Sequence, residues 1–191
     1  QPSSTPGTHY AVVVSPEREQ SLAAGVIPSR YIQLTNFLTP DLHHRILNYA
    51  VQQERAFVGS STSTGDVDYR QSSVLHHFPE FSNLMRSEIH RAFTEVITSL
   101  KLNYFDITQV EAQLTAHNDG HYYKIHNDNG SEDTATRVLT YVYYFYQDPK
   151  PFSRGDLRIY DSRIENNYYV QADSFQDVNP INNSIVFFPS H

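Results

Sequence analysis

The chain has 191 residues and a formal net charge of −7, from 14 lysines and arginines against 21 aspartates and glutamates. This length suits one domain with one hydrophobic core, and the acidic balance without a basic run argues against nucleic acid as a partner. The sequence has ten histidines and no cysteine, so any transition-metal site must be built from imidazole and carboxylate groups. No apolar stretch reaches the roughly 20 residues of a membrane helix. We therefore expect a cytoplasmic protein without a membrane partner.

Two helices are predicted in the first half of the chain. Residues 1–25 are rich in Ser, Pro and Glu and are expected to form a flexible arm, with a single domain over residues 26–191. The first helix, over residues 40–54, begins at a threonine N-cap followed by proline at the first helical position. The second, over residues 79–100, carries apolar residues at intervals of three and four, which is the stripe of a helix packed on a core.

After Asn103 the apolar residues recur at every second position, which is typical of β-strands. The predicted strands cover residues 105–114, 138–146, 156–160, 168–171 and 184–188. Helices followed only by strands indicate an α+β chain, mainly β, in which the helices buttress a sandwich or barrel. The polar loop over residues 59–68, rich in Ser, Thr and Gly, is hypothesised to be a lid over a substrate site.

A His-x-Asp pattern occurs twice, over residues 117–119 and 126–128. Residues two apart in a strand point to the same face, so a histidine and an aspartate at this spacing can hold one cation. A second histidine from a neighbouring strand would complete the 2-His-1-carboxylate triad of iron(II) oxygenases. Spacing alone is weak support, because about one chance match is expected in a chain of this composition. On spacing alone, surface roles for these histidines are favoured.

Four segments in order give the pattern a wider context. They are His126-Asn127-Asp128, residues 137–144 (RVLTYVYY), residues 155–160 (GDLRIY) and residues 183–190 (NSIVFFPS). This series, from Val110 to the end of the chain, resembles the iron(II) and 2-oxoglutarate-dependent dioxygenases of the prolyl 4-hydroxylase class. The resemblance implies a double-stranded β-helix, or jelly roll, as the core.

The same resemblance implies the roles of particular residues. His126 and Asp128 would hold Fe(II), with 2-oxoglutarate and O2 as co-substrates. Tyr144 matches the tyrosine whose hydroxyl binds the far carboxylate of 2-oxoglutarate, and Leu157 matches an apolar wall against that co-substrate. Arg137 also matches a family position, and we assign it to the structure or rim of the site.

Other histidines stay outside this assignment. His117 and His121 are expected either at the mouth of the site or simply on the surface. The pairs His43-His44 and His76-His77 have no carboxylate at ligand spacing, and we expect solvated surface side chains at all four positions.

The third metal ligand departs from the family pattern. The resemblance places a histidine a few residues after the Phe-Phe-x-Ser segment and a basic residue on the following strand. His191 comes directly after Ser190, too soon for that turn, so it is a weak candidate. An apolar strand over residues 184–188 would also be left with a bare edge. We therefore expect the true third ligand beyond His191, in a domain truncated at its C-terminus.

The resemblance implies hydroxylation of a C–H bond while 2-oxoglutarate is decarboxylated to succinate. The expected substrate is a prolyl residue of a peptide or protein, a free amino acid or another small molecule. Two other classes of function stay open. One is a cupin-like metalloenzyme that does not use 2-oxoglutarate, and the other is a non-catalytic jelly-roll binding module.

Overall fold

The computed structural model describes residues 18, 22–60 and 69–190. Its helices are α2 (Pro40–Gln52) and α3 (Pro79–Ser99), with short 3-10 helices η1 (Glu54–Ala56) and η2 (Glu132–Thr134). Its strands are β1 (Ile32–Thr35), β2 (Val58–Gly59), β3 (Arg70–Gln71), β4 (Ser73–Leu75), β5 (Leu114–Ala116), β6 (Tyr122–Tyr123), β7 (Leu139–Tyr144), β8 (Leu157–Glu165), β9 (Tyr168–Val178) and β10 (Ser184–Pro189). Mixed helices and antiparallel sheets confirm the α+β class.

A three-stranded antiparallel sheet of order β1-β10-β7 forms the centre of the molecule. In its register Phe187 of β10 lies opposite Tyr141, and Ser184 opposite Tyr144. Alternation along β7 turns Leu139, Tyr141 and Tyr143 towards the core and Thr140, Val142 and Tyr144 to the other face. This face of β7, turned away from the helices and called the outward face below, carries residues of the site.

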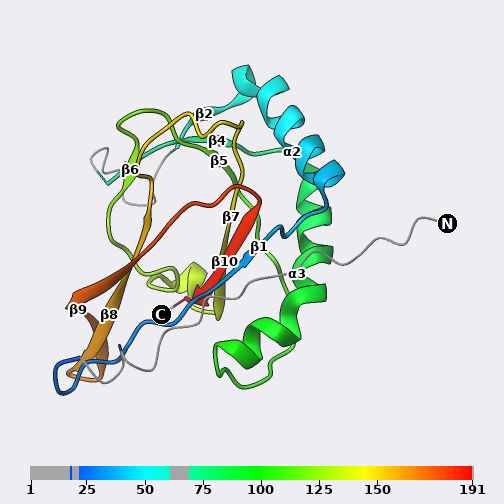
Figure 1. Cartoon of the computed structure of the whole chain (residues 1–191). Helices are drawn as coiled ribbons and strands as arrows, with labels where there is room; N and C mark the ends of the chain where they lie inside the picture. Colours follow the sequence, from blue (N-terminus) through cyan, green and yellow to red (C-terminus); the bar gives the residue numbers. More distant parts are fainter. Residues whose placement is uncertain (1–17, 19–21, 61–68, 191) are drawn as a thin grey trace.

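The two helices pack on the core face of this sheet, on the right of the view in Figure 1. Thr39 caps α2 by accepting a hydrogen bond from the Leu42 amide, with Pro40 at the first position. The buried residues shared by helices and sheet are Ile32, Leu34, Phe37, Leu38, Ile46, Phe81, Met85, Ile89, Val96, Leu100, Ile185 and Phe187. Both predicted helices are confirmed, and α2 ends at Gln52 because the chain then tightens into η1. No helix in residues 22–60 or 69–190 has both the length and the apolar character needed to span a bilayer.

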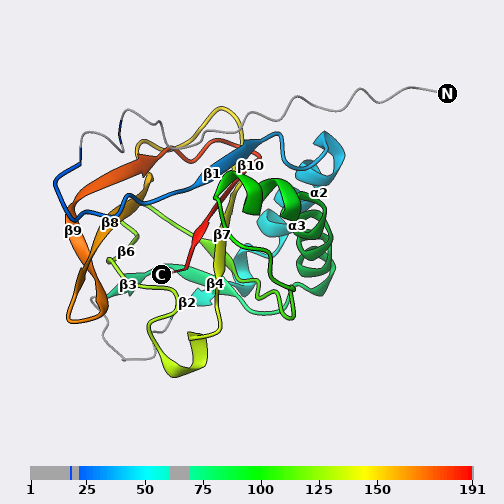
Figure 2. The same cartoon turned by 90° about the horizontal axis from the view of Figure 1, so that it is seen from below.

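The remaining strands form three smaller sheets: β2-β4-β5, β3-β6 and the hairpin β8-β9. Figures 1 and 2 both place β6 and the hairpin on the side of the central sheet away from the helices. The hairpin turns at Asn166 and Asn167, both with positive φ, as a two-residue type I′ turn requires. Mutual pairing lengthens β8 and β9 well beyond their predicted bounds.

Two strand expectations are wrong. Residues 105–113 join no strand ladder in the described chain, and only Leu114–Ala116 pairs, with β4. The alternating pattern there reflects side-chain packing, since Phe105 contacts Phe93 of α3 and Val110 packs on the core. The apolar strand over residues 184–188 has no bare edge either, because β1 covers one side and β7 the other. The loop predicted to be a lid lies outside the described residues except for Gly59 and Ser60.

Candidate functional site

His126 and Asp128 lie together just after β6. Neither residue lies in a strand, although the prediction from strand alternation requires both to do so. His126 follows β6 by three residues and Asp128 lies in a turn. Asn127 forms this turn: its side-chain oxygen accepts the Asn129 amide at 3.2 Å. The turn brings the His126 Nε2 within 3.2 Å of the Asp128 Oδ1.

Contacts on its other atoms hold the His126 ring in place. The Nδ1 atom lies 2.8 Å from the Lys124 carbonyl oxygen, which can only accept, so Nδ1 carries the proton and Nε2 is left for another partner. The Tyr123 ring stacks on the imidazole with centroids 3.7 Å apart. Tyr69 meets both rings edge-on.

Asp128 is held by a chain of hydroxyl groups. Its Oδ2 accepts a hydrogen bond of 2.8 Å from the Thr140 hydroxyl on the outward face of β7. Because Thr140 gives its one hydroxyl proton to the carboxylate, the Ser190 hydroxyl 2.9 Å away must donate to Thr140. Arg137 donates to the Asp128 backbone carbonyl and pairs with Glu111. The Oδ1 atom therefore faces the free nitrogen of His126.

The electrostatics of this pair favour a protonated imidazole beside a carboxylate. Burial lowers the pKa of His126, but the hydrogen bonds to Asp128 and to the Lys124 carbonyl raise it, and the net pKa lies above 6.5. Burial raises the pKa of Asp128, while hydrogen bonds from His126 and Thr140 lower it, to a net value below 3.8. A cation binding here must displace the proton shared by the pair.

The spacing of the two free atoms fits one metal ion. Adjacent nitrogen and oxygen ligands about 2.1 Å from an ion at a right angle lie about 3 Å apart, close to the 3.2 Å observed. An imidazole and a carboxylate suit a first-row divalent metal. In the part of the chain that the structure describes, no third His, Cys, Asp or Glu joins them to make a three-ligand group. His191 lies outside the described residues.

The first His-x-Asp copy is arranged differently. Within the described residues, no hydrogen bond or ion pair joins His117 to Asp119. Instead, His117 meets His121 edge-on with ring centroids 6.4 Å apart across a turn. The pKa of His117 is lowered by burial, by the charge of Arg70 and by His121. This copy lacks the imidazole–carboxylate pair seen at His126.

An open cleft connects the pair to the other predicted site residues. Its lining includes His126, Asp128, Thr140, Tyr144 and Leu157. Thr140 and Tyr144 share the outward face of β7, with Cα atoms about 13 Å apart along the strand. Burial, and then the charge of Asp156, raise the pKa of the Tyr144 hydroxyl above its ordinary value, so it is a neutral donor. It has no hydrogen-bond partner among the described residues, which leaves it available to a ligand.

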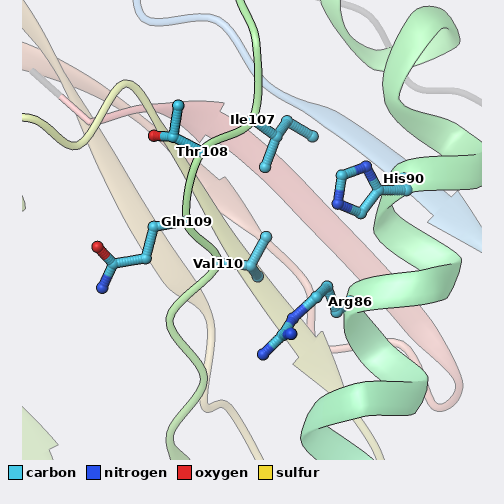
Figure 3. Close-up of a pocket in the computed structure, with 6 residues that line it drawn as sticks. All are labelled: Arg86, His90, Ile107, Thr108, Gln109 and Val110. Atoms are coloured by element: carbon cyan, nitrogen blue, oxygen red, sulfur yellow. The ribbon is translucent and has the colours of Figure 1, made fainter.

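A second, smaller hollow lies away from this pair, between α3 and the unpaired segment before β5. Figure 3 shows its lining, and its volume is about 200 Å³. Its lining residues are Arg86, His90, Ile107, Thr108, Gln109 and Val110. The polar side chains of Thr108 and Gln109 point away from Arg86 and His90 in this view. The side chains do not converge on a ligand position.

Sequence reasoning missed several residues around the pair. Thr140 could have been found, because it lies four residues before Tyr144 and so shares its face. Ser190 ends the Phe-Phe-x-Ser segment, but nothing in the sequence indicated its contact with Thr140 or the position of Arg70, since only the fold brings these residues near the pair. One histidine expectation is wrong: His43 is buried on the inner face of α2, with its Nε2 3.1 Å from the Asn182 side-chain oxygen. His44, His76 and His77 are exposed as expected.

Comparison with known proteins agrees with this region of the chain. Residues 112–191 match the family model described as the 2OG-Fe(II) oxygenase superfamily. The chain is also 44% identical over 177 residues to an uncharacterized PKHD-type hydroxylase of Synechocystis sp.. That match covers 92% of this chain but 58% of the relative, so the chain spans less than two thirds of the relative's length. These findings confirm the resemblance recognised from the sequence: residues 112–191 are similar to the 2OG-Fe(II) oxygenase superfamily, and most of the chain is similar to a PKHD-type hydroxylase.

Proposed function

We propose that the protein is an Fe(II) and 2-oxoglutarate-dependent oxygenase that hydroxylates a C–H bond of a prolyl residue in a peptide or protein, or of a free amino acid. One observation carries the proposal. The His126 Nε2 and the Asp128 Oδ1 contact each other at 3.2 Å, while the other polar side-chain atom of each residue is held by the Lys124 carbonyl or the Thr140 hydroxyl. The family match over residues 112–191 supports iron and 2-oxoglutarate as the groups that this pair serves.

Each residue of the chain then has a defined task. His126 and Asp128 would hold the metal, and Thr140 and Ser190 hold the carboxylate in position for it. Tyr144 donates a hydrogen bond to the far carboxylate of 2-oxoglutarate, and Leu157 packs against its methylene groups. When bound, Fe(II) supplies the oxidation of the C–H bond by O2, with decarboxylation of 2-oxoglutarate to succinate. The third ligand is assigned to a histidine outside the described residues, of which His191 is one.

The arrangement of the strands supports a jelly-roll core as part of this proposal. The sheet β1-β10-β7 carries Thr140 and Tyr144 on its outward face, and β6 and the hairpin β8-β9 lie across from that face. Residues from both sides line the same cleft. A double-stranded β-helix would place two such layers around one site.

Metal binding by ligand variants tests the proposal. Mn(II), which takes the place of Fe(II) without oxidation, is titrated calorimetrically into the protein. His126→Ala and Asp128→Ala should each weaken binding by at least about a hundredfold, because each removes one of the two charged or basic donors. His117→Ala, which changes the first His-x-Asp copy, is the matched control and should bind normally. Loss of binding in H117A with binding kept in H126A would overturn the assignment.

A second measurement separates the competing classes of function. Protein loaded with Fe(II) is supplied with 2-oxoglutarate and O2, and succinate is measured in the absence of any other substrate. Slow succinate formation that disappears in D128A supports the oxygenase. Tight metal binding with no interaction with 2-oxoglutarate would favour the cupin-like alternative. A protein that binds no metal at all would favour the binding module.

A further inference from the structure

Arg70 lies one aromatic ring away from the proposed metal ligand. It belongs to β3, where it pairs in register with Tyr123 of β6. Its guanidinium carbon lies 4.8 Å from the centre of the Tyr123 ring, and that ring stacks on His126 at 3.7 Å. Arg70 also lines the cleft that contains His126 and Asp128. The guanidinium therefore places a positive charge beside the Tyr123 ring that stacks on His126.

Neutral acceptors hold this guanidinium in one orientation. The Nε atom donates to the Ser72 hydroxyl at 2.9 Å. The Nη2 atom donates to the Gln113 side-chain oxygen at 2.9 Å and to the Thr115 hydroxyl at 3.4 Å. The Nη1 atom has no hydrogen-bond partner among the described residues. One edge of the fork is thus fixed by the protein, and the remaining nitrogen is left to donate to a ligand.

Among the residues that the structure describes, Arg70 also forms no ion pair with a carboxylate. Six other arginines pair with acids: Arg18 with Asp161, Arg45 with Glu80, Arg91 with Glu88, Arg137 with Glu111, Arg158 with Asp177 and Arg163 with Glu165. Over residues 22–60 and 69–190, no carboxylate lies within ion-pair distance of Arg70. Burial, and then the charge of Arg70, lower the pKa of His117. The contact with Tyr123 accounts for the position of the guanidinium but does not neutralise it.

We propose that Arg70 is a binding residue for a carboxylate group in the cleft, with its Nη1 atom donating the hydrogen bond. A guanidinium that neutral acceptors hold in one orientation, with no carboxylate partner among the described residues, is well suited to a carboxylate. The inference rests on the proposed function for the identity of that carboxylate, which has two sources. It belongs either to 2-oxoglutarate or to the substrate, such as the α-carboxylate of a free amino acid.

The test compares two probes on Mn(II)-loaded protein. The first probe is 2-oxoglutarate, and the second is N-acetyl-L-proline, with its uncharged amide as reference. Arg70→Met should weaken the affinity for at least one of the carboxylate probes by roughly tenfold to a hundredfold, the range for a charged hydrogen bond. Arg70→Lys, which keeps the charge but loses the fork, should fall between R70M and wild type. Arg86→Met removes an arginine of α3 that does not line the cleft, and this variant should bind both probes normally.

The outcomes show which molecule supplies the carboxylate and which result overturns the inference. Loss confined to 2-oxoglutarate assigns the carboxylate to the co-substrate, and loss confined to N-acetyl-L-proline assigns it to the substrate. Wild-type affinity of R70M for both probes, or no binding of either probe by wild-type protein, overturns the inference. Failure of the proposed function is read separately, from Mn(II) affinity in H126A. Thermal unfolding of R70M and R70K checks that any loss of affinity occurs in folded protein.

Discussion

Replacing Thr140 by valine should weaken metal binding without touching a metal ligand. Valine has the shape of threonine but lacks the hydroxyl that donates to the Asp128 Oδ2 at 2.8 Å. A hydrogen bond to a charged group contributes about 1.5–3 kcal/mol. The Asp128 side chain is 23% exposed, which favours the lower half of that range. A loss of about 1.5–2 kcal/mol corresponds to Mn(II) affinity reduced by about tenfold to thirtyfold.

The same substitution should also reduce the stability of the metal-free protein. Ser190 is 3% exposed, and its hydroxyl loses its Thr140 partner. An unsatisfied buried hydroxyl costs about 1 kcal/mol or more of the free energy of unfolding. Chemical denaturation measures this loss, and calorimetric titration with Mn(II) measures the affinity.

Two matched variants test whether the Thr140 hydroxyl is the cause of the expected loss. Thr140→Ser keeps the hydroxyl and should bind Mn(II) within about threefold of wild type, since the charged hydrogen bond is retained. Val142→Ala alters the same face of β7 without a polar contact and should leave Mn(II) affinity largely unchanged. Wild-type affinity in T140V, or equal losses in T140S and T140V, would show that the hydroxyl does not hold the carboxylate for a metal.

Two further predictions concern pH and the fold. Because the pKa of His126 is raised above 6.5, Mn(II) affinity should fall by up to about tenfold per pH unit as the pH drops through and below that value. The ion pair with Asp128 has the opposite effect on the metal-free protein: it stabilises the fold at low pH, and this stabilisation is lost as the pH rises through the folded pKa. Mn(II) titrations between pH 5.5 and 8, about one to two units around the ordinary value, check the first prediction, and an affinity independent of pH would contradict it. Asp161 is fully buried and accepts hydrogen bonds from Arg18 and Ser29, so Asp161→Asn should cost roughly 2–4 kcal/mol of the free energy of unfolding, because it replaces the buried carboxylate of this ion pair with a neutral amide. The pKa of Asp161 is lowered from 3.8, so the wild-type advantage should shrink as the pH falls through the lowered pKa, and an advantage that instead grows as the pH falls below 3.8 would refute the account.

The two helices could be predicted because their signals lie in residues close together in the sequence. The spacing of Phe81, Met85 and Ile89 predicts the buried stripe of α3, and Thr39-Pro40 predicts the start of α2. Both depend on residues within one or two turns of each other. The segment over residues 105–113 has an equally clear period but no strand ladder, because alternation records which side chains are buried and a strand also needs a neighbouring backbone.

The candidate site divides in the same way. The His-x-Asp spacing and the ordered series of segments are enough to point to His126 and Asp128 from the sequence alone. The expected cause of their convergence, alternation along a strand, is wrong, because a turn at Asn127 brings the two side chains together instead. The sequence also could not predict which atoms of the pair would face a metal ion. That depends on the Lys124 carbonyl, which binds the His126 Nδ1, and on the Thr140 hydroxyl, which binds the Asp128 Oδ2.

The sequence by itself determined the chemistry that is possible: no thiolate, an imidazole and a carboxylate two residues apart, and β-rich segments in the order of a known superfamily. The tertiary structure alone decided which groups surround that pair. Ser190 reaches Thr140 across 50 positions of the chain, and Arg70 reaches the Tyr123 ring because β3 pairs with β6. The period and spacing of residues in the sequence report local conformation, whereas contacts between distant segments form only when the strands pair in a particular order and register.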